Sequence, residues 1–501
     1  MGQMGRSARL RRAGLPGVAG LAGLAARVEW TGWAARAGGV GRAVSLATGV
    51  VTGRVTPDAL AMAWNSASLV VSWCIAAGLG QVTWILAARL FAPGDVGVAS
   101  GFLSATMLCA QIALLGLGSA VTTLLPSHRD RPEQLLKTVF TTVAVSAAAI
   151  GGAFLLLARF GLSELNVFAS RPSYAVTFLA SGVLLSLGLL ADQTFTALRR
   201  ADQVAVRSAL AGIARVGTLV LLAVLLGRES ALPLLIALAC QSGLACFLAI
   251  AQLQRALPGY RHRLGFERGL ARTVLRIGLP NHFVSLAVLA PGLILPLIVA
   301  ETLSAAHAAY WYVAWMLAGL AFVAPGSMGM ALFAELTHRT HDREAAVRQG
   351  LRWALTFGGA VAVALAAGAD LLLLLLGPDY RAAGALPLRL LLLGILPVTL
   401  IEAYVATCRA SGRIAEGGAV CAVSGLLSVA GAVFVGQTYG LVGVALAWLA
   451  AQTLAGGWAA WRLSLALRRP ARAPSSARAP AATPADAPAP EAEPASLTVG
   501  S

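Results

Sequence analysis

Long apolar runs, separated by short polar or glycine-rich links, repeat along most of the chain. A helix needs about 20 mainly apolar residues to cross the hydrocarbon core of a membrane, and twelve runs meet this requirement. The predicted spans are 66–88, 97–125, 138–158, 174–197, 206–226, 231–252, 277–300, 308–334, 353–376, 384–408, 414–436 and 440–461. The longest link, 253–276, has 24 residues, so no folded domain fits between spans. The pattern predicts an all-α polytopic membrane protein with about 12 transmembrane helices.

The composition supports this fold class. Of the 501 residues, 58% are hydrophobic and only 12% are charged, whereas a soluble domain carries about 25% charged residues. A chain with so little charge cannot cover a water-facing surface, so a soluble globular protein is excluded. The six cysteines lie in apolar runs without metal-ligand spacing, and we expect neither a metal nor a cofactor.

The positive charges predict the orientation. Basic residues accumulate on the cytoplasmic side of membrane proteins, where they also meet anionic lipid. If the N-terminus is cytoplasmic, the inside segments hold 31 of the 38 cations and the outside loops hold 6, with Arg215 inside span five. This split predicts a membrane protein with both termini cytoplasmic. It also explains the net charge of +17, so no nucleic-acid partner is needed to account for that charge.

The span order predicts five segments. A basic Gly/Ala-rich leader covers 1–60, six spans lie in 61–252, a basic cytoplasmic linker covers 253–276, and six more spans lie in 277–465. The tail, 466–501, is rich in Pro and Ala and is predicted to be disordered. Because six is even, both halves begin on the cytoplasmic side, so any repeat is parallel. Two such six-helix bundles suit an alternating-access transporter.

The leader allows three interpretations. Leu15–Ala26 follows three arginines in the way that the apolar part of a signal peptide does. That run is interrupted by glycine, and the first span begins about 40 residues later. A basic segment that is disordered or lies beside the membrane fits better, and a start codon placed too early is the third interpretation.

Five different short motifs lie at the ends of predicted spans. Ala88–Gly97 forms a tight turn between spans one and two, and Leu117–Ala120 ends span two. Arg276–Pro280 opens span seven, Leu376–Tyr380 closes span nine, and Tyr439–Ala445 opens span twelve. In this order, the set resembles the polysaccharide-biosynthesis flippases of the multidrug/oligosaccharidyl-lipid/polysaccharide (MOP) exporter superfamily, over about 64–465.

The resemblance implies a fold and a function. The fold is V-shaped, with two six-helix bundles. The function is transport of a polyprenyl-linked oligosaccharide from the inner to the outer leaflet for a cell-surface polysaccharide, with glycosyltransferases and a polymerase as partners. Relatives often carry an acidic residue in span one or span seven for cation coupling. Span one and residues 281–300 have none, so the energy source is not identified.

Other functions fit less well. The single lysine, Lys137, is not part of a phosphate-binding G-x-x-x-x-G-K-[ST] loop, and the outside loops are too short for a membrane glycosyltransferase or a polymerase, so we expect no enzyme. A lipid II flippase shares most of the same features. A cation-coupled drug exporter is expected to have an acidic cavity, whereas span one has no carboxylate. A membrane scaffold that recruits glycan enzymes through its basic ends is the alternative from another class.

Arg215 is the strongest candidate for a substrate contact. An arginine at the membrane centre usually faces the protein interior or an aqueous cavity, and its guanidinium is suited to phosphate. The alternative is a shallow Arg215 that extends to the cytoplasmic interface. Gln81, the deepest amide of span one, and Asn281 of span seven are further candidates for the cavity wall.

Aromatic, proline and charged residues complete the candidate set. Tyr310 and Trp311 open span eight, where aromatic side chains form an interfacial belt or stack on sugar rings. Pro291 and Pro296 are expected to kink span seven, either as a gate or as a static bend. Arg89 and Asp95 are candidates for a pair or a gate at the first outside turn.

Glu402, an acid within span ten, is the candidate for ion coupling. The alternative is a structural pair with Arg409, seven residues later on the same helix face.

Overall fold

A computed structural model of the chain describes residues 78–125, 132–257, 265–338 and 343–468. Within these ranges, all regular structure is helical. The predicted leader, the first part of span one and almost all of the tail lie outside the described residues.

Short turns connect the helices of the first half. A helix over 78–90 is followed by α4 (Pro93–Ala113), α5 (Leu117–Leu124), α6 (Pro132–Gly161), α7 (Val167–Ser170), α8 (Pro172–Ala197), α9 (Ala201–Leu225) and α10 (Leu232–Ala256). Proline begins α4, α6 and α8. It suits this position because its missing N–H has no helical partner there and its φ is already close to the helical value.

The second half contains the longest helices. They are α11 (Arg268–Thr302), α12 (Ala305–His338), α13 (Arg343–Leu374), α14 (Pro378–Leu393), α15 (Ile395–Ala410) and α16 (Ile414–Arg468). Each of the twelve predicted spans overlaps a described helix. Eight described helices are long and apolar enough to cross a membrane, and the bent pair α14–α15 makes a ninth. The prediction of an all-α polytopic membrane protein is confirmed.

Two breaks were not expected from hydropathy, and a third falls where spans eleven and twelve are predicted to separate. Span two is divided into α4 and α5 by a turn in which Leu115 and Gly116 have positive φ angles of 48° and 73°. Span ten is divided at Gly394 into α14 and α15, which meet at 42°. Within α16, Gly440 has a φ of 59° and separates the segments that correspond to spans eleven and twelve. Glycine tolerates this left-handed region because it has no Cβ.

The two ends of the molecule are packed differently. The name "basic end" is used here for the end with the link 198–200, which contains Arg199 and Arg200, and "opposite end" for the end with the links 162–166 and 303–304. At the opposite end, one cluster of buried apolar side chains includes Phe102 and Phe168 of the first half together with Trp311 of the second. At the basic end there are two separate clusters, one around Phe140 and one around Tyr404. Apart from the first part of α11, which belongs to the Phe140 cluster, the described residues of the two halves therefore share a core only at the opposite end.

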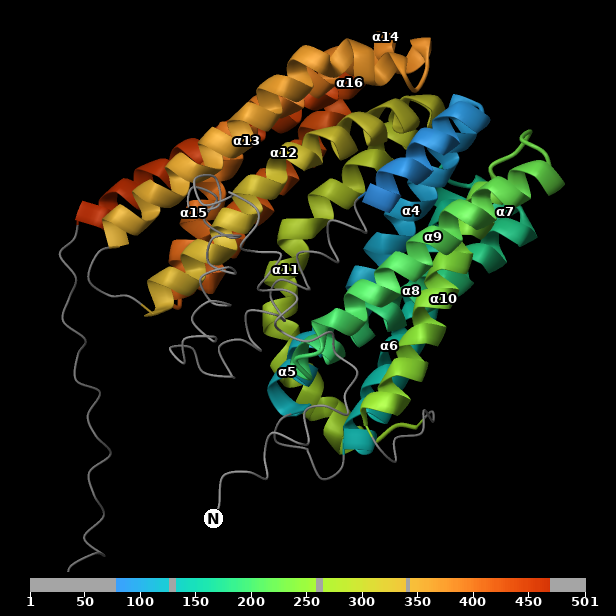
Figure 1. Ribbon diagram of the computed structural model, residues 1–501, viewed down its shortest axis with the longest axis horizontal. Coiled ribbons are helices and arrows are strands. Elements are labelled where there is room, and N and C mark those ends of the chain that lie inside the picture. Colours follow the sequence, from blue (N-terminus) through green and yellow to red (C-terminus); the bar gives the residue numbers. More distant parts are fainter. Residues whose placement is uncertain (1–77, 126–131, 258–264, 339–342, 469–501) are drawn as a thin grey trace, which may run out of the picture.

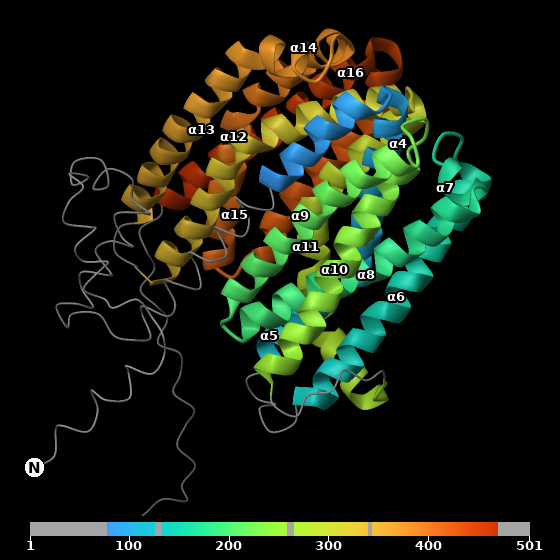
Figure 2. The same ribbon diagram turned by 45° about the vertical axis from the view of Figure 1, so that its right-hand side comes forward.

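Helix α11 contacts both halves. Near its beginning, Gly278 lies so close to Gly116 that a Cβ added to either glycine would come within 2.5 Å of the other's carbonyl oxygen. Farther along, the Pro291 ring occupies the space beside Gly425 of α16. Figures 1 and 2 show α11 and α12 diverging from their shared turn towards the basic end. As a result, the first part of α11 packs with the first half of the chain.

Candidate functional site

Arg215 lies in the interior of the first half. Its side chain is 6% exposed, and about 21 Å of helix rise separates it from Ala201 at the start of α9. Arg215 Nε donates a hydrogen bond to Thr83 Oγ1 (2.9 Å), and Nη1 donates one to Gln241 Oε1 (2.9 Å). The guanidinium is thus bound by two neighbouring helices inside the bundle, which disfavours the shallow alternative.

The surroundings of Arg215 are compact. A cavity of about 10 Å³ is lined by Thr83, Trp84 and Arg215 together with apolar residues of α4, α9 and α10, and a space of this size holds about one water molecule. Gly80 adjoins the guanidinium: a Cβ there would lie 3.6 Å from Arg215 Nη2. Arg215 therefore lies in a small pocket within the first half whose other walls are mainly apolar.

The helix over 78–90 connects this pocket to the second half. Thr83 binds Arg215, and the next residue, Trp84, packs against Tyr312 of α12 with ring centroids 4.6 Å apart. Tyr312 therefore lies directly behind the pocket wall. Two successive residues thus join the Arg215 pocket to the contact between the two halves.

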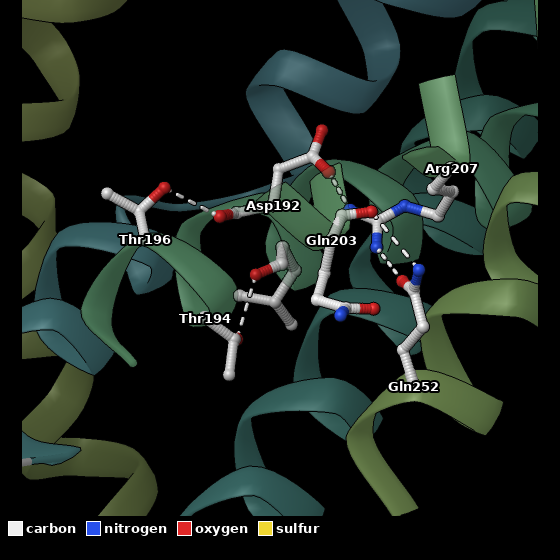
Figure 3. Close-up of polar contacts among 7 residues, drawn as sticks. Asp192, Thr194, Thr196, Gln203, Arg207 and Gln252 are labelled. Carbon is white, nitrogen blue, oxygen red and sulfur yellow. Dashed lines mark hydrogen bonds and ion pairs between the residues drawn. The ribbon is translucent and has the colours of Figure 1, made fainter. Parts of the chain in front are cut away.

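A second buried arginine was missed at the sequence level. Arg207 of α9 is only 2% exposed and forms an ion pair with Asp192 of α8, whose side chain is 40% exposed. Arg207 Nη1 also donates to Gln252 Oε1 of α10 (2.6 Å), and its guanidinium lies 5.1 Å from the Phe195 ring. Figure 3 shows the Asp192, Arg207 and Gln252 side chains converging from three helices.

The sequence contained a weak signal for this pair. Arg207 stands near the start of the predicted fifth span and Asp192 near the end of the fourth, where charged side chains are usually solvated. The two residues are 15 positions apart across a helical hairpin, which is a spacing at which opposite charges on adjacent helices meet.

Glu402 of α15 is partly buried and faces α12. A Cβ added to Gly329 of α12 would lie 2.8 Å from Glu402 Oε2, so the glycine leaves the space that the carboxylate occupies. Among the residues described, none forms a hydrogen bond or an ion pair with this carboxylate. No direct ion pair joins Glu402 to Arg409, whose side chain is exposed, although Arg409 acts on the carboxylate electrostatically; the alternative of a structural pair therefore has no direct contact behind it.

The other candidates for the cavity wall are dispersed. Gln81 is partly buried, and the side chain of Asn281 lies outside the described part of the chain. Tyr310 packs edge-on against Tyr380. Trp311 is fully buried in the shared core and packs on Trp315, so it belongs neither to a lipid-facing belt nor to an open cavity in this conformation.

The candidates for gate and turn positions lie at or near the opposite end. Arg89 and Asp95 form no ion pair in the structure; instead, Asp95 is held by the backbone N–H of Ala231 and lies close to Arg171. The pKa of Asp95 is raised, because burial outweighs these two contacts. Pro291 and Pro296 lie within α11.

Two of the sequence motifs mark contacts between the halves. Gly97, in the turn that begins α4, meets the first residue of α12: an added Cβ would lie 1.6 Å from the Ala305 carbonyl oxygen. Gly278, in the motif that opens span seven, meets Gly116. Within the described ranges, no group of three or more His, Cys, Asp and Glu residues is arranged to hold a metal ion.

Comparison with known proteins shows a shared fold. No protein-family model and no curated protein matches the sequence. The structure is similar to an inward-facing multidrug resistance MATE family transporter of the MOP superfamily, with a TM-score of 0.58 at 15% identity over 81% of this chain and 100% of the other. It is also similar to the lipid II flippase MurJ in an inward closed conformation, with a TM-score of 0.64 at 12% identity over 79% and 87%.

A third similar structure is a MOP superfamily transporter from Pyrococcus furiosus, with a TM-score of 0.54 at 15% identity over 82% of this chain and 97% of the other. Its description states that the polarity of its binding pocket is reversed and suggests a different function. The chain thus has the fold of MOP superfamily transporters.

Proposed function

We propose that this protein moves a polyprenyl-linked oligosaccharide precursor from the inner to the outer leaflet by alternating access, for cell-surface polysaccharide synthesis. The packing of the two halves supports this proposal. They share an apolar core at the opposite end and have separate cores at the basic end. Such an arrangement can open at one end while it is closed at the other.

The observation that carries the proposal is the environment of Arg215. Its two hydrogen-bond acceptors, Thr83 and Gln241, are both neutral, and no described carboxylate forms an ion pair with it. A buried cation without a counter-ion is costly in a membrane, and an anionic ligand removes that cost. A pyrophosphate offers several oxygens to the guanidinium, which can bind them in a bidentate manner.

The chemistry of a lipid-linked sugar makes such a site useful. Each hydroxyl that loses its hydrogen bonds in hydrocarbon costs about 1–7 kcal/mol, so a sugar headgroup does not cross unaided. In our proposal the headgroup passes between the two halves while the prenyl chain remains in the lipid. The enclosed Arg215 pocket becomes accessible when the contact between Trp84 and Tyr312 opens.

A lipid II flippase is the second candidate. It is supported by the similarity to MurJ, whose TM-score of 0.64 exceeds the 0.58 of the MATE transporter, and lipid II is also a polyprenyl pyrophosphate. A cation-coupled drug exporter is disfavoured because the positive charge of Arg215 repels a cation. A non-transporting scaffold for glycan enzymes is disfavoured because such a function does not require the buried charge of Arg215.

The proposal includes a location and partners. We place the protein in the bacterial inner membrane with both termini cytoplasmic, beside glycosyltransferases and a polymerase. Cysteines introduced at Ala92 and Ser230 are then expected to react with an impermeant maleimide from outside, and one at Gln203 from inside. Reaction from the reverse sides contradicts this orientation.

Depletion of the protein followed by mass analysis of polyprenyl-linked sugars tests the function. A flippase for a surface glycan predicts accumulation of a completed lipid-linked oligosaccharide, with lipid II unchanged. Accumulation of lipid II instead supports the second candidate. An unchanged pool of both lipids contradicts transport of either.

A further inference from the structure

Glu301 forms a contact between the two halves that the sequence did not indicate. It lies in the last turn of α11, beyond the predicted span 277–300. Its Oε1 accepts hydrogen bonds from the backbone N–H of Ser163 (2.5 Å) and from Ser163 Oγ (2.6 Å). Its Oε2 accepts from the backbone N–H groups of Glu164 and Leu165, each at 3.2 Å. One carboxylate thus receives four donors.

These donors belong to the first half of the chain, in the link between α6 and α7. Leu165 is anchored there, since it is 4% exposed and belongs to the shared core. A Cβ added to Gly101 of α4 would lie 3.6 Å from Leu165 Cδ2, which is an ordinary van der Waals contact. The link is therefore fixed to the first half, and Glu301 is carried by α11. Separation of the halves at the opposite end breaks all four hydrogen bonds.

The charge of Glu301 strengthens the contact. Hydrogen bonds to an ionised acceptor are stronger than those between neutral groups. Partial burial raises the pKa of Glu301, but the hydrogen bonds from Ser163, Leu165 and Glu164 outweigh burial and hold the pKa below its usual value. The carboxylate is therefore ionised when the contact is formed.

A second close contact lies next to Glu301. Gly97 of α4 meets the backbone of Ala305, four residues after Glu301. The turn between α11 and α12 is thus held to the first half by a backbone contact and by a charged hydrogen-bonded contact. The backbone contact involves no charged side chain. A single substitution of Glu301 therefore removes the charged contact and leaves the backbone contact in place.

We propose that Glu301 is the gate residue of the opposite end: its carboxylate closes that end by binding the 163–165 backbone, and it releases those donors when the end opens. This proposal goes beyond the transport function and does not depend on which substrate is carried. It predicts that loss of the carboxylate increases the population in which the opposite end is open.

Double electron–electron resonance measures this population without a substrate. Spin labels are attached at Glu229→Cys in the first half and Ala382→Cys in the second, both exposed positions at the opposite end, with the native cysteines replaced by alanine in the full-length protein in nanodiscs. We expect one main short distance in the parent protein. In Glu301→Gln, we expect a longer distance to gain at least several-fold in population.

The matched control is Glu164→Gln. It removes the same charge from a residue that contributes only its backbone N–H to the contact. The exposed Glu164 side chain takes no part, so an unchanged distance distribution is expected. Ser163→Ala removes only the hydroxyl donor and should give a smaller shift than Glu301→Gln. It also serves as a milder test if Glu301→Gln folds poorly. A parent-like distribution in Glu301→Gln or, where that variant does not fold, in Ser163→Ala overturns the proposal.

Discussion

The Trp84 indole ring packs against the Tyr312 phenol ring at a centroid distance of 4.6 Å, and this pair joins the first half of the chain to the second beside the Arg215 pocket. Because Thr83 binds Arg215, movement of the helix over 78–90 affects both contacts. The proposed anion site and the opposite end are therefore connected through two successive residues.

The substitution Tyr312→Leu tests this connection. It keeps an apolar side chain but removes the aromatic pair, which contributes about 0.5–1.5 kcal/mol beyond the buried area. We expect a shift of roughly two- to tenfold towards the conformation open at the opposite end, measured by the reactivity of Ala308→Cys, a fully buried position of the shared core, with an impermeant maleimide.

Its control is Trp353→Leu, which removes the stacked Trp353–Phe357 pair within α13. Both of those residues lie on one exposed helix face, so this variant should leave the reactivity unchanged. Equal reactivity in all three proteins contradicts a role for the Trp84–Tyr312 contact in closure.

The variants Arg215→Ala and Arg215→Lys test the anion site. A hydrogen bond to a charged group contributes about 1.5–3 kcal/mol, so we expect Arg215→Ala to lower glycan surface display about 10- to 100-fold at a normal protein level. Arg215→Lys keeps the charge but cannot donate to Thr83 and Gln241 in the same geometry, and an intermediate effect is expected. Display is measured by lectin or antibody binding, with protein level by immunoblot.

Arg228→Ala is the control for a simple loss of positive charge. Arg228 is exposed in the link between α9 and α10, so display should be unaffected. Normal display in Arg215→Ala removes Arg215 from the substrate site.

The Asp192–Arg207 pair is expected to stabilise the first half. Asp192→Asn leaves a buried guanidinium with only neutral partners. Because Asp192 is 40% exposed, we expect a loss of about 1–3 kcal/mol in the free energy of unfolding, below the range for a fully buried pair. Thermal unfolding in detergent measures it. The double variant Asp192→Asn/Arg207→Met should recover part of the loss, whereas a fully additive effect of the two substitutions argues against the pair.

Glu402 remains the predicted coupling residue. Glu402→Gln removes the titrating group, and we expect glycan transport to lose its dependence on the proton gradient. Gly329→Ala should have a related effect, because the new methyl group would lie 2.8 Å from Glu402 Oε2 and displace the carboxylate. Export is measured with and without a protonophore.

Glu344→Gln is the control for Glu402, since Glu344 is exposed and paired with Arg348 on α13. It should respond to the protonophore like the parent protein. A parent-like response in Glu402→Gln excludes Glu402 as the coupling residue.

Hydropathy predicts the positions and order of the apolar helices because each span must be apolar over a length fixed by the membrane. It does not predict the breaks at Gly116 and Gly394, because single glycines are common inside spans and only the packing decides which of them bend the chain. The close approach of Gly116 and Gly278, for example, depends on two helices that are far apart in the sequence.

The site was less predictable than the fold. Arg215 was found because an arginine inside a span is rare, but its neutral partners Thr83 and Gln241 come from two other helices. Glu301 gave no signal, since its partners are mostly backbone N–H groups more than 130 positions away and any residue supplies those. Trp311 was expected at a surface, whereas the packing of the two halves buries it.

Reconstitution tests the central claim most directly. Proteoliposomes are loaded with the polyprenyl-linked oligosaccharide extracted from depleted cells, and an impermeant glycan-oxidising reagent measures the fraction exposed in the outer leaflet over time. The account predicts rapid exposure of the whole pool with the parent protein and slow exposure with Arg215→Ala. Exposure at the same slow rate with the parent protein and with protein-free liposomes contradicts it.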